Sequence, residues 1–229
     1  MRRLATIAAD WLNVAVRWPR SILDRTPPDA YDNGDRVPVI VLPGIWEPWR
    51  FMLPLAKVLH AEGHPIYPVP GLRLNGAPLD ASAEKVAEAL SEHDAPRVVL
   101  VAHSKGGLVG KQLMLHPKVG HRVAGLVALC SPFGGSTLSL PVLARTPLGL
   151  FSPANSALTA LAAEQAVNAK IVSIGSSYDE MVPNGTHLEG ARNITLEMAG
   201  HFRPLVSPSV QQLVLQEVRR FDTSPDPGH

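Results

Sequence analysis

Short apolar runs alternate with longer segments of helical period along most of the chain. Runs rich in β-branched residues lie at 37–42, 65–69, 97–102, 122–129, 170–175 and 193–198. Between them, helical patterns lie at 49–61, 80–93, 105–116, 156–169 and 208–221. Such alternation is typical of a parallel sheet with helices on both faces. We therefore expect an α/β fold at 37–221, with a minimal, mostly parallel sheet of about six strands.

The first residues carry a different pattern. Apolar residues recur at helical spacing over 1–18, and a stretch rich in Pro, Asp and Gly follows up to residue 36. Residues 1–36 are thus predicted to form an amphipathic helix and an irregular linker. The helix either rests on lipid or covers a pocket, since Trp and Arg suit an interface, or it docks on the core. We favour docking on the core.

Targeting signals are weak in this sequence. Asp10 and Asn13 interrupt the N-terminal apolar run, so it lacks the form of a clear signal peptide. No stretch approaches the roughly 20 apolar residues that a membrane span needs. We expect a cytoplasmic protein, and peripheral membrane contact through the N-terminal helix stays open. Residues 222–229 are expected to form a flexible tail.

One segment within the domain has no clean period. Residues 132–152 combine glycines, prolines and many leucines. A long apolar loop in a compact domain is usually functional or mobile. We therefore expect a short lid-like insertion at this point.

The amino-acid composition restricts the classes of partner that we expect this protein to bind. Lys and Arg number 21 against 20 Asp and Glu, a net charge of +1, so no global field would attract nucleic acid. Charged residues make up 18%, below the usual share of about 25%, which predicts some exposed apolar surface. The single cysteine, Cys130, excludes an internal disulfide, and no metal-ligand spacing occurs. We expect neither metal nor cofactor, and the oligomeric state stays open.

The stretch "VVLVAHSKGGLVG" places Ser104 between an apolar strand and a helix that opens with Gly106 and Gly107. Such a turn lifts the hydroxyl clear of the carboxyl edge of the sheet, and small neighbours allow the sharp backbone to approach other elements. The helix N-terminus also aims free N–H groups at any anion beside the serine. The pattern resembles the G-x-S-x-G nucleophile elbow, with Ala102 in place of the first glycine.

A serine nucleophile needs a base, and the base needs a carboxylate. Asp179 follows one late strand and His201 follows the last, beyond the carboxyl ends where parallel sheets bind ligands. His187, in the "THLEG" loop, is the reserve base. His103 adjoins Ser104 and is interpreted as a packing and hydrogen-bonding neighbour.

An oxyanion needs backbone donors as well. Lys105 follows the serine, and Ile45 follows the Pro43–Gly44 turn at the end of an early strand, so both N–H groups are candidate oxyanion donors. A lysine in the first turn of a helix opposes the helix dipole. Its ammonium is therefore expected to reach solvent or to meet an acidic group.

Several blocks occur in order: "LPGI", "AHSKGG", "LCSPFGGS", "FSPANSALTAL", "DEMVP" and "GHFRPLVSP". Together they resemble bacterial lipases and esterases of the α/β-hydrolase superfamily over nearly all of 37–221. The resemblance implies that Ser104 is the nucleophile, His201 the base and Asp179 the orienting acid, with Ile45 and Lys105 as oxyanion donors. No cofactor is implied.

The expected substrate is a small ester with an apolar acyl group. Four candidate residues for binding it come from the oxyanion turn and the lid-like segment: Trp46, Phe133, Leu150 and Phe151. The sequence favours a serine hydrolase that works through an acyl-enzyme. An acyltransferase or thioesterase with the same three residues stays open, as does a non-catalytic binding protein with the same fold.

Overall fold

A computed structural model describes residues 2–137 and 146–223. Six strands form one sheet in the order β2-β1-β3-β4-β5-β6, and every neighbouring pair is parallel. The strands are β1 (Val39–Leu42), β2 (Ile66–Pro68), β3 (Val98–His103), β4 (Val123–Leu129), β5 (Ile171–Tyr178) and β6 (Arg192–Ala199). The predicted α/β fold is confirmed, and the six predicted strands are all present.

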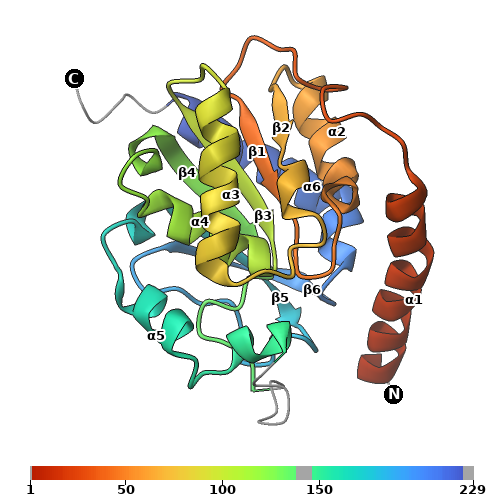
Figure 1. Cartoon of the computed structure of the whole chain (residues 1–229). Coiled ribbons are helices and arrows are strands. Elements are labelled where there is room, and N and C mark those ends of the chain that lie inside the picture. The colour runs from red at the N-terminus through yellow and green to blue at the C-terminus, as the bar shows by residue number, and fades with distance from the viewer. Residues whose placement is uncertain (1, 138–145, 224–229) are drawn as a thin grey trace.

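Helices cover both faces of the sheet (Figure 1). They are α1 (Arg2–Leu23), α2 (Leu53–Ala61), α3 (Leu79–Glu92), α4 (Lys105–Met114), α5 (Ser156–Ala163) and α6 (Pro208–Thr223). The short 3-10 helices are η1 (Trp49–Met52), η2 (Pro70–Leu72), η3 (Gly120–Arg122), η5 (Pro147–Phe151), η6 (Asn168–Lys170) and η7 (Arg203–Val206). None of the described helices is both long and apolar enough to cross a membrane.

The core has two layers, one on each side of the sheet. Ile40, Leu100 and Leu126 pack with α3 and α4, while Val41 and Val101 pack with α2 and α6 on the other face. Each residue of β3 is buried, as expected for a strand between two helical layers. Because every strand is parallel, all carboxyl ends meet at one edge, and the polar loops that follow them converge there.

Two element boundaries differ from the sequence prediction. Helix α1 continues through Pro19 to Leu23 rather than giving way to the linker at Trp18. Proline removes one N–H, but the next turn is still closed by the bond from Asp24 N to Arg20 O (2.8 Å). Helix α6 extends to Thr223 and so includes Asp222, which was expected in the tail. The Asp222 carboxylate accepts from Val37 N (3.2 Å) and pairs with Arg36 (3.3 Å).

Candidate active site

The turn between β3 and α4 holds Ser104 in a strained conformation. Its φ of 51° and ψ of −120° lie where few residues other than glycine are found. Ser104 N donates to Leu129 O (2.8 Å), and Gly107 N donates to Ser104 O (3.0 Å). The side chain is nearly buried, at 7% exposure. The strain is thus supported by both neighbouring elements, and it places the hydroxyl at the carboxyl edge of the sheet.

Two glycines allow α4 to lie this close to the sheet. A Cβ on Gly106 would be 2.2 Å from Leu42 O, at the end of β1. A Cβ on Gly107 would be 2.1 Å from Ser131 Oγ, in the loop after β4. Real Cβ atoms do not approach this near, so both positions require glycine.

Asp179 and His201 come together from the loops after β5 and β6. His201 Nδ1 lies 2.8 Å from Asp179 Oδ2, and both side chains are 3% exposed. The other carboxylate oxygen accepts from Met181 N (2.8 Å) and Val182 N (3.0 Å). Burial alone would raise the pKa of Asp179, but His201 and the two N–H groups lower it overall. Asp179 is therefore a carboxylate that orients the imidazole.

Ser104 and His201 line one cavity of about 590 Å³. The predicted nucleophile, base and acid are thus brought to the same edge of the sheet. Within the described part of the chain, no hydrogen bond joins the Ser104 hydroxyl to His201. Nucleophile–base hydrogen bonds are often long in the free state and shorten when substrate binds. His187 lies apart from this cluster, exposed beside Glu189 (3.7 Å).

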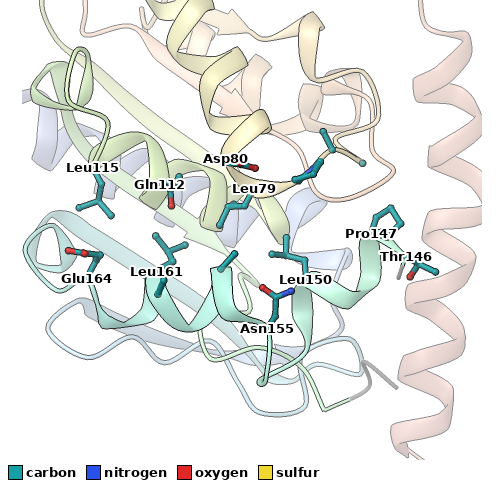
Figure 2. A pocket seen from close by; sticks show the side chains of 15 residues that line it. Leu79, Asp80, Gln112, Leu115, Thr146, Pro147, Leu150, Asn155, Leu161 and Glu164 are labelled. Atoms are coloured by element: carbon teal, nitrogen blue, oxygen red, sulfur yellow. The ribbon is translucent and has the colours of Figure 1, made fainter. Parts of the chain in front are cut away.

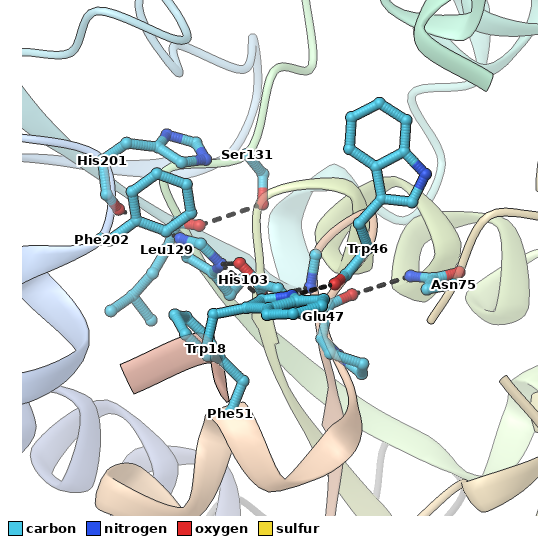
Figure 3. Close-up of polar contacts among 12 residues, drawn as sticks. Trp18, Trp46, Glu47, Phe51, Asn75, His103, Leu129, Ser131, His201 and Phe202 are labelled. Atoms are coloured by element: carbon cyan, nitrogen blue, oxygen red, sulfur yellow. Dashed lines mark hydrogen bonds and ion pairs between the residues drawn. The ribbon is translucent and has the colours of Figure 1, made fainter. Parts of the chain in front are cut away.

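His103 does more than pack beside Ser104. Its Nδ1 lies 2.9 Å from Glu47 Oε1, and its Nε2 lies 3.0 Å from the His201 carbonyl oxygen (Figure 3). The His201 carbonyl oxygen and an ionised Glu47 both accept, so this arrangement favours a His103 ring that is protonated on both nitrogens. Burial is the largest single effect and lowers its pKa, but the charge and hydrogen bond of Glu47, the His201 carbonyl and the charge of Asp179 together raise it. His103 therefore ties the end of β3 to the backbone of His201.

Glu47 extends this contact to the turn after β1. Its Oε2 accepts from Gly44 N (2.7 Å), and the side chain is 4% exposed. The next residue back, Trp46, has a φ of 59°, and its carbonyl accepts from Trp18 Nε1 (2.7 Å). No described group accepts from Ile45 N–H. The turn is thus fixed on both sides, and the Ile45 N–H is left available to a ligand.

The Lys105 side chain meets neither solvent nor an acid, so that prediction was wrong. Its ammonium is buried and donates to Asn75 O (2.7 Å) and Ala77 O (2.5 Å). Burial lowers its pKa to about 8. Asn75 in turn donates from Nδ2 to Pro43 O (2.8 Å). Lys105 thus binds the loop 75–77, and Asn75 of that loop binds Pro43 in the candidate oxyanion turn. The Lys105 side chain therefore stabilises this turn indirectly, through neutral oxygen acceptors.

Asp10, on α1, holds the His201 loop from outside the domain. Its fully buried carboxylate accepts from His201 N (2.9 Å), Phe202 N (3.1 Å) and Arg203 N (2.8 Å). Sequence reasoning missed this role, although one signal was present. Asp10 is the one acidic residue of α1, whose other charged residues are all arginines, and a carboxylate among apolar neighbours needs a specific partner.

Comparison with known proteins identifies the fold family. Residues 78–203, more than half of the chain, match the family described as the PGAP1-like alpha/beta domain. The chain belongs to this family. No curated protein matches the sequence. The matched range of this PGAP1-like domain includes Ser104, Asp179 and His201 but not the turn after β1 or α1.

Solved structures of α/β-hydrolases share the fold of the PGAP1-like domain. Bacillus licheniformis lipase BlEst2 is 16% identical, with a TM-score of 0.57 over 79% of this chain and 91% of that one. Aspergillus fumigatus lipase B is 19% identical, with a TM-score of 0.65 over 81% and 53%. A thermophilic esterase from Thermogutta terrifontis is 16% identical, with a TM-score of 0.57 over 83% and 92%. At these identities the likeness shows the fold.

The cavity of the PGAP1-like domain is mostly apolar. Of the four residues predicted to bind an acyl group, Trp46 and Phe151 line it. Phe133 does not line it, because its ring is buried in the core cluster on the α3 and α4 side of the sheet. Leu150 lines a different cavity of about 860 Å³, between α3, α4 and α5 (Figure 2). Part of the predicted lid, 138–145, lies outside the described residues.

Helix α1 supplies one wall of this cavity. Trp11, Val14 and Trp18 line the same cavity as Ser104 and His201. Trp11 also packs edge-on against Phe202, with ring centroids 5.9 Å apart. The helix therefore both docks on the domain and covers its pocket, two interpretations that had been treated as alternatives.

Cys130 lies close to Asp179 and His201, and all three side chains are of types that can bind metal ions. Cys130 Sγ lies within 4.8 Å of ligand atoms of Asp179 and His201. Burial and the charge of Asp179 raise the pKa of the thiol well above its usual range. Metals bind the thiolate, so this cluster favours a neutral thiol beside the Asp179 carboxylate.

Proposed function

We propose that this protein hydrolyses carboxylic esters through an acyl-enzyme formed on Ser104. The observation that carries the proposal is the buried Asp179–His201 pair (2.8 Å) at the cavity that Ser104 lines. A carboxylate that holds the imidazole through Nδ1 leaves Nε2 to take a proton from a nucleophile. The strained serine turn and the family assignment support the same chemistry.

The first half of the reaction forms the acyl-enzyme. His201 takes the Ser104 proton as Oγ attacks the ester carbonyl, and the carbonyl electron pair moves onto its oxygen. The N–H groups of Ile45 and Lys105 donate to this oxyanion, helped by the N-terminus of α4. When the tetrahedral intermediate collapses, the C–O bond to the alcohol breaks and His201 gives its proton to the leaving oxygen.

Water completes the cycle. His201 removes a proton from the water that attacks the acyl-enzyme, and Ser104 leaves with that proton as the acid is released. Asp179 stays ionised throughout and stabilises the imidazolium. Burial raises the pKa of Asp179, but the charge of His201 and the backbone N–H groups lower it overall, and a lowered pKa suits this role.

The cavity favours an ester with an apolar acyl group. Its walls include Trp46, Phe51, Leu148, Phe151 and Val182, and burial of each methylene contributes about 0.8 kcal/mol. The lining offers few polar groups that could pair with a charged substrate. We therefore expect activity to rise with acyl length until the cavity is filled.

A series of p-nitrophenyl esters of increasing acyl length tests the proposal. Ser104→Ala should lower kcat by about 10⁴-fold or more, with unchanged thermal unfolding. Ser156→Ala is the matched control, because Ser156 is exposed at the start of α5. A fluorophosphonate should label the wild-type protein at Ser104 and leave Ser104→Ala unlabelled. A folded wild-type protein that is neither labelled nor active on any ester would overturn the proposal.

A further inference from the structure

Helix α1 exposes a row of apolar side chains on the side that faces away from the domain. The side that faces the domain carries the buried Asp10 and Ser21, the cavity-lining Val14, and Arg17, which donates to Phe51 O (2.9 Å). The side that faces away carries Leu12, Val16 and Leu23. Leu12 is 65% exposed and Leu23 is 76% exposed. A helix of a globular protein normally turns such residues inward.

Exposed apolar side chains are concentrated around this helix. In residues 6–137 and 146–223, the large hydrophobic side chains that are well exposed lie either on α1 or at residues that line the cavity. Those on α1 are Trp11, Leu12, Val16, Trp18, Ile22 and Leu23, and the others are Trp46 and Leu74. A soluble monomer rarely exposes a contiguous apolar surface of this kind without a partner. The surface is therefore both apolar and continuous with the cavity.

The charges around this surface are positive. Asp10, the acid within α1, is buried, whereas Arg20 and Arg25 are exposed. Asp24, just beyond the helix, lies 3.9 Å from Arg50. An apolar strip flanked by arginine and tryptophan matches the interface of an anionic bilayer, where acyl chains, aromatic rings and cations each find partners.

We propose that the outer face of α1 docks this protein on an anionic lipid surface. Leu12, Val16, Ile22 and Leu23 enter the boundary between headgroups and acyl chains, while Arg20 and Arg25 lie at the phosphates. Because Trp11 and Trp18 flank this face and also line the cavity, a lipid ester enters the site beside α1. The identity of that substrate rests on the proposed function, whereas the docking itself does not.

Vesicle binding tests the docking. The full chain is mixed with vesicles of phosphatidylcholine, with or without phosphatidylglycerol, and the bound fraction is measured by flotation. The triple variant Leu12→Ser, Val16→Ser, Leu23→Ser should bind anionic vesicles at least tenfold more weakly. Its activity on a short soluble ester should match that of the wild type, because none of these residues lines the cavity. Ala81→Ser, Ala162→Ser, Ala163→Ser, which changes exposed positions on α3 and α5, is the matched control.

Two further variants distinguish the contribution of charge to vesicle binding from that of the catalytic site. Arg20→Gln should weaken binding to anionic vesicles severalfold and leave binding to neutral vesicles unchanged. Ser104→Ala should bind vesicles as the wild type does, so a failure of ester hydrolysis would leave the docking result intact.

Three outcomes would overturn the docking proposal. In the first, wild-type protein binds neither kind of vesicle. In the second, the triple variant binds as tightly as its control. In the third, sedimentation shows that the wild type is a dimer and the triple variant a monomer, and neither binds vesicles. The outer face of α1 would then bind a second copy of the chain.

Discussion

Ser104 and His201 line the same cavity, but different parts of the chain hold them. The turn at Ser104 is held by β3, by α4 and by the close approach of Gly106 to β1. The backbone of His201 is held by Asp10, which lies 191 residues away on α1, and by the ring of His103. The proposed nucleophile is thus held by the core, whereas the proposed base is held in part by a helix attached to the outside of the domain.

Four substitutions test this difference: Gly106→Ala at the serine turn, Asp10→Ala at the His201 loop, and Glu47→Gln and Glu180→Gln at acids close to the groups that hold that loop. Changes at the serine turn should act mainly on the stability of the whole fold. Changes at the His201 loop should act mainly on turnover, because the sheet and its helices do not need α1 to pack.

Gly106→Ala should have the largest effect. The new Cβ would lie 2.2 Å from Leu42 O, a backbone atom within the sheet, so neither side can yield cheaply. We expect a loss of about 3 kcal/mol or more in the free energy of unfolding, measured by chemical denaturation. Gly71→Ala is the control, because a Cβ there meets nothing within 4 Å. Equal stability of the two variants would show that α4 can move away from β1.

Asp10→Ala should come next. It leaves the buried N–H groups of His201, Phe202 and Arg203 without their acceptor, and each unsatisfied group costs about 1–3 kcal/mol. We expect the loop to shift and kcat/KM on a short ester to fall by about 10–100-fold, while far-UV circular dichroism keeps its αβ form. Amide hydrogen exchange at 201–203 should accelerate.

Asp10→Asn is the conservative partner, because it keeps one acceptor oxygen. Its kcat/KM should lie between those of the wild type and Asp10→Ala. If all three proteins share the same kcat/KM, then α1 does not position His201.

Glu47→Gln should have a smaller effect that depends on pH. The raised pKa of His103 contributes stability that is complete below its unfolded pKa of about 6.5 and is lost as pH rises through the folded pKa. Glutamine removes the charge but keeps one acceptor, so we expect a loss of about 1–2 kcal/mol at low pH. Denaturation midpoints across pH measure this difference. A variant with the same pH slope as the wild type would contradict the assigned ion pair.

Glu180→Gln should have the smallest effect and the opposite sign. Burial, with the nearby charges of Asp10 and Asp179, raises the pKa of Glu180 to about 7. The folded protein therefore holds a proton that the unfolded chain has lost, and stability falls as pH rises from the unfolded pKa of about 4.5 to about 7. The variant should have a higher melting temperature than the wild type at pH above 7. Glu189→Gln, at an exposed site, should show no such gain.

The sheet and the serine turn were predictable because their signals are local. A β-branched run such as 97–102 has few alternatives to a buried strand, and a strand followed by Ser104, Gly106 and Gly107 specifies a tight turn by adjacent residues alone. Asp179 and His201 were predictable as candidates because each directly follows a strand of the parallel sheet.

The supports of the site could not be predicted from local pattern. The partners of Asp10 and Lys105 are backbone atoms, N–H groups of 201–203 and carbonyls of Asn75 and Ala77, and a sequence does not mark which backbone groups lack partners. Phe133 was misplaced for a related reason. An aromatic residue beside Pro132 can turn either into the cavity or into the core, and tertiary packing decides between them.

The hydrogen bonds between Asp10 and the His201 loop also matter for limited proteolysis of the chain. Residues 24–36 form an irregular and largely exposed segment between α1 and β1, the kind of chain that proteases cut first. One cut there would leave the sheet, Ser104, Asp179 and His201 on a single fragment, while α1 would stay attached only through noncovalent contacts. The hydrogen bonds that the Asp10 carboxylate accepts from the His201 loop would then last only as long as the cut helix stays bound.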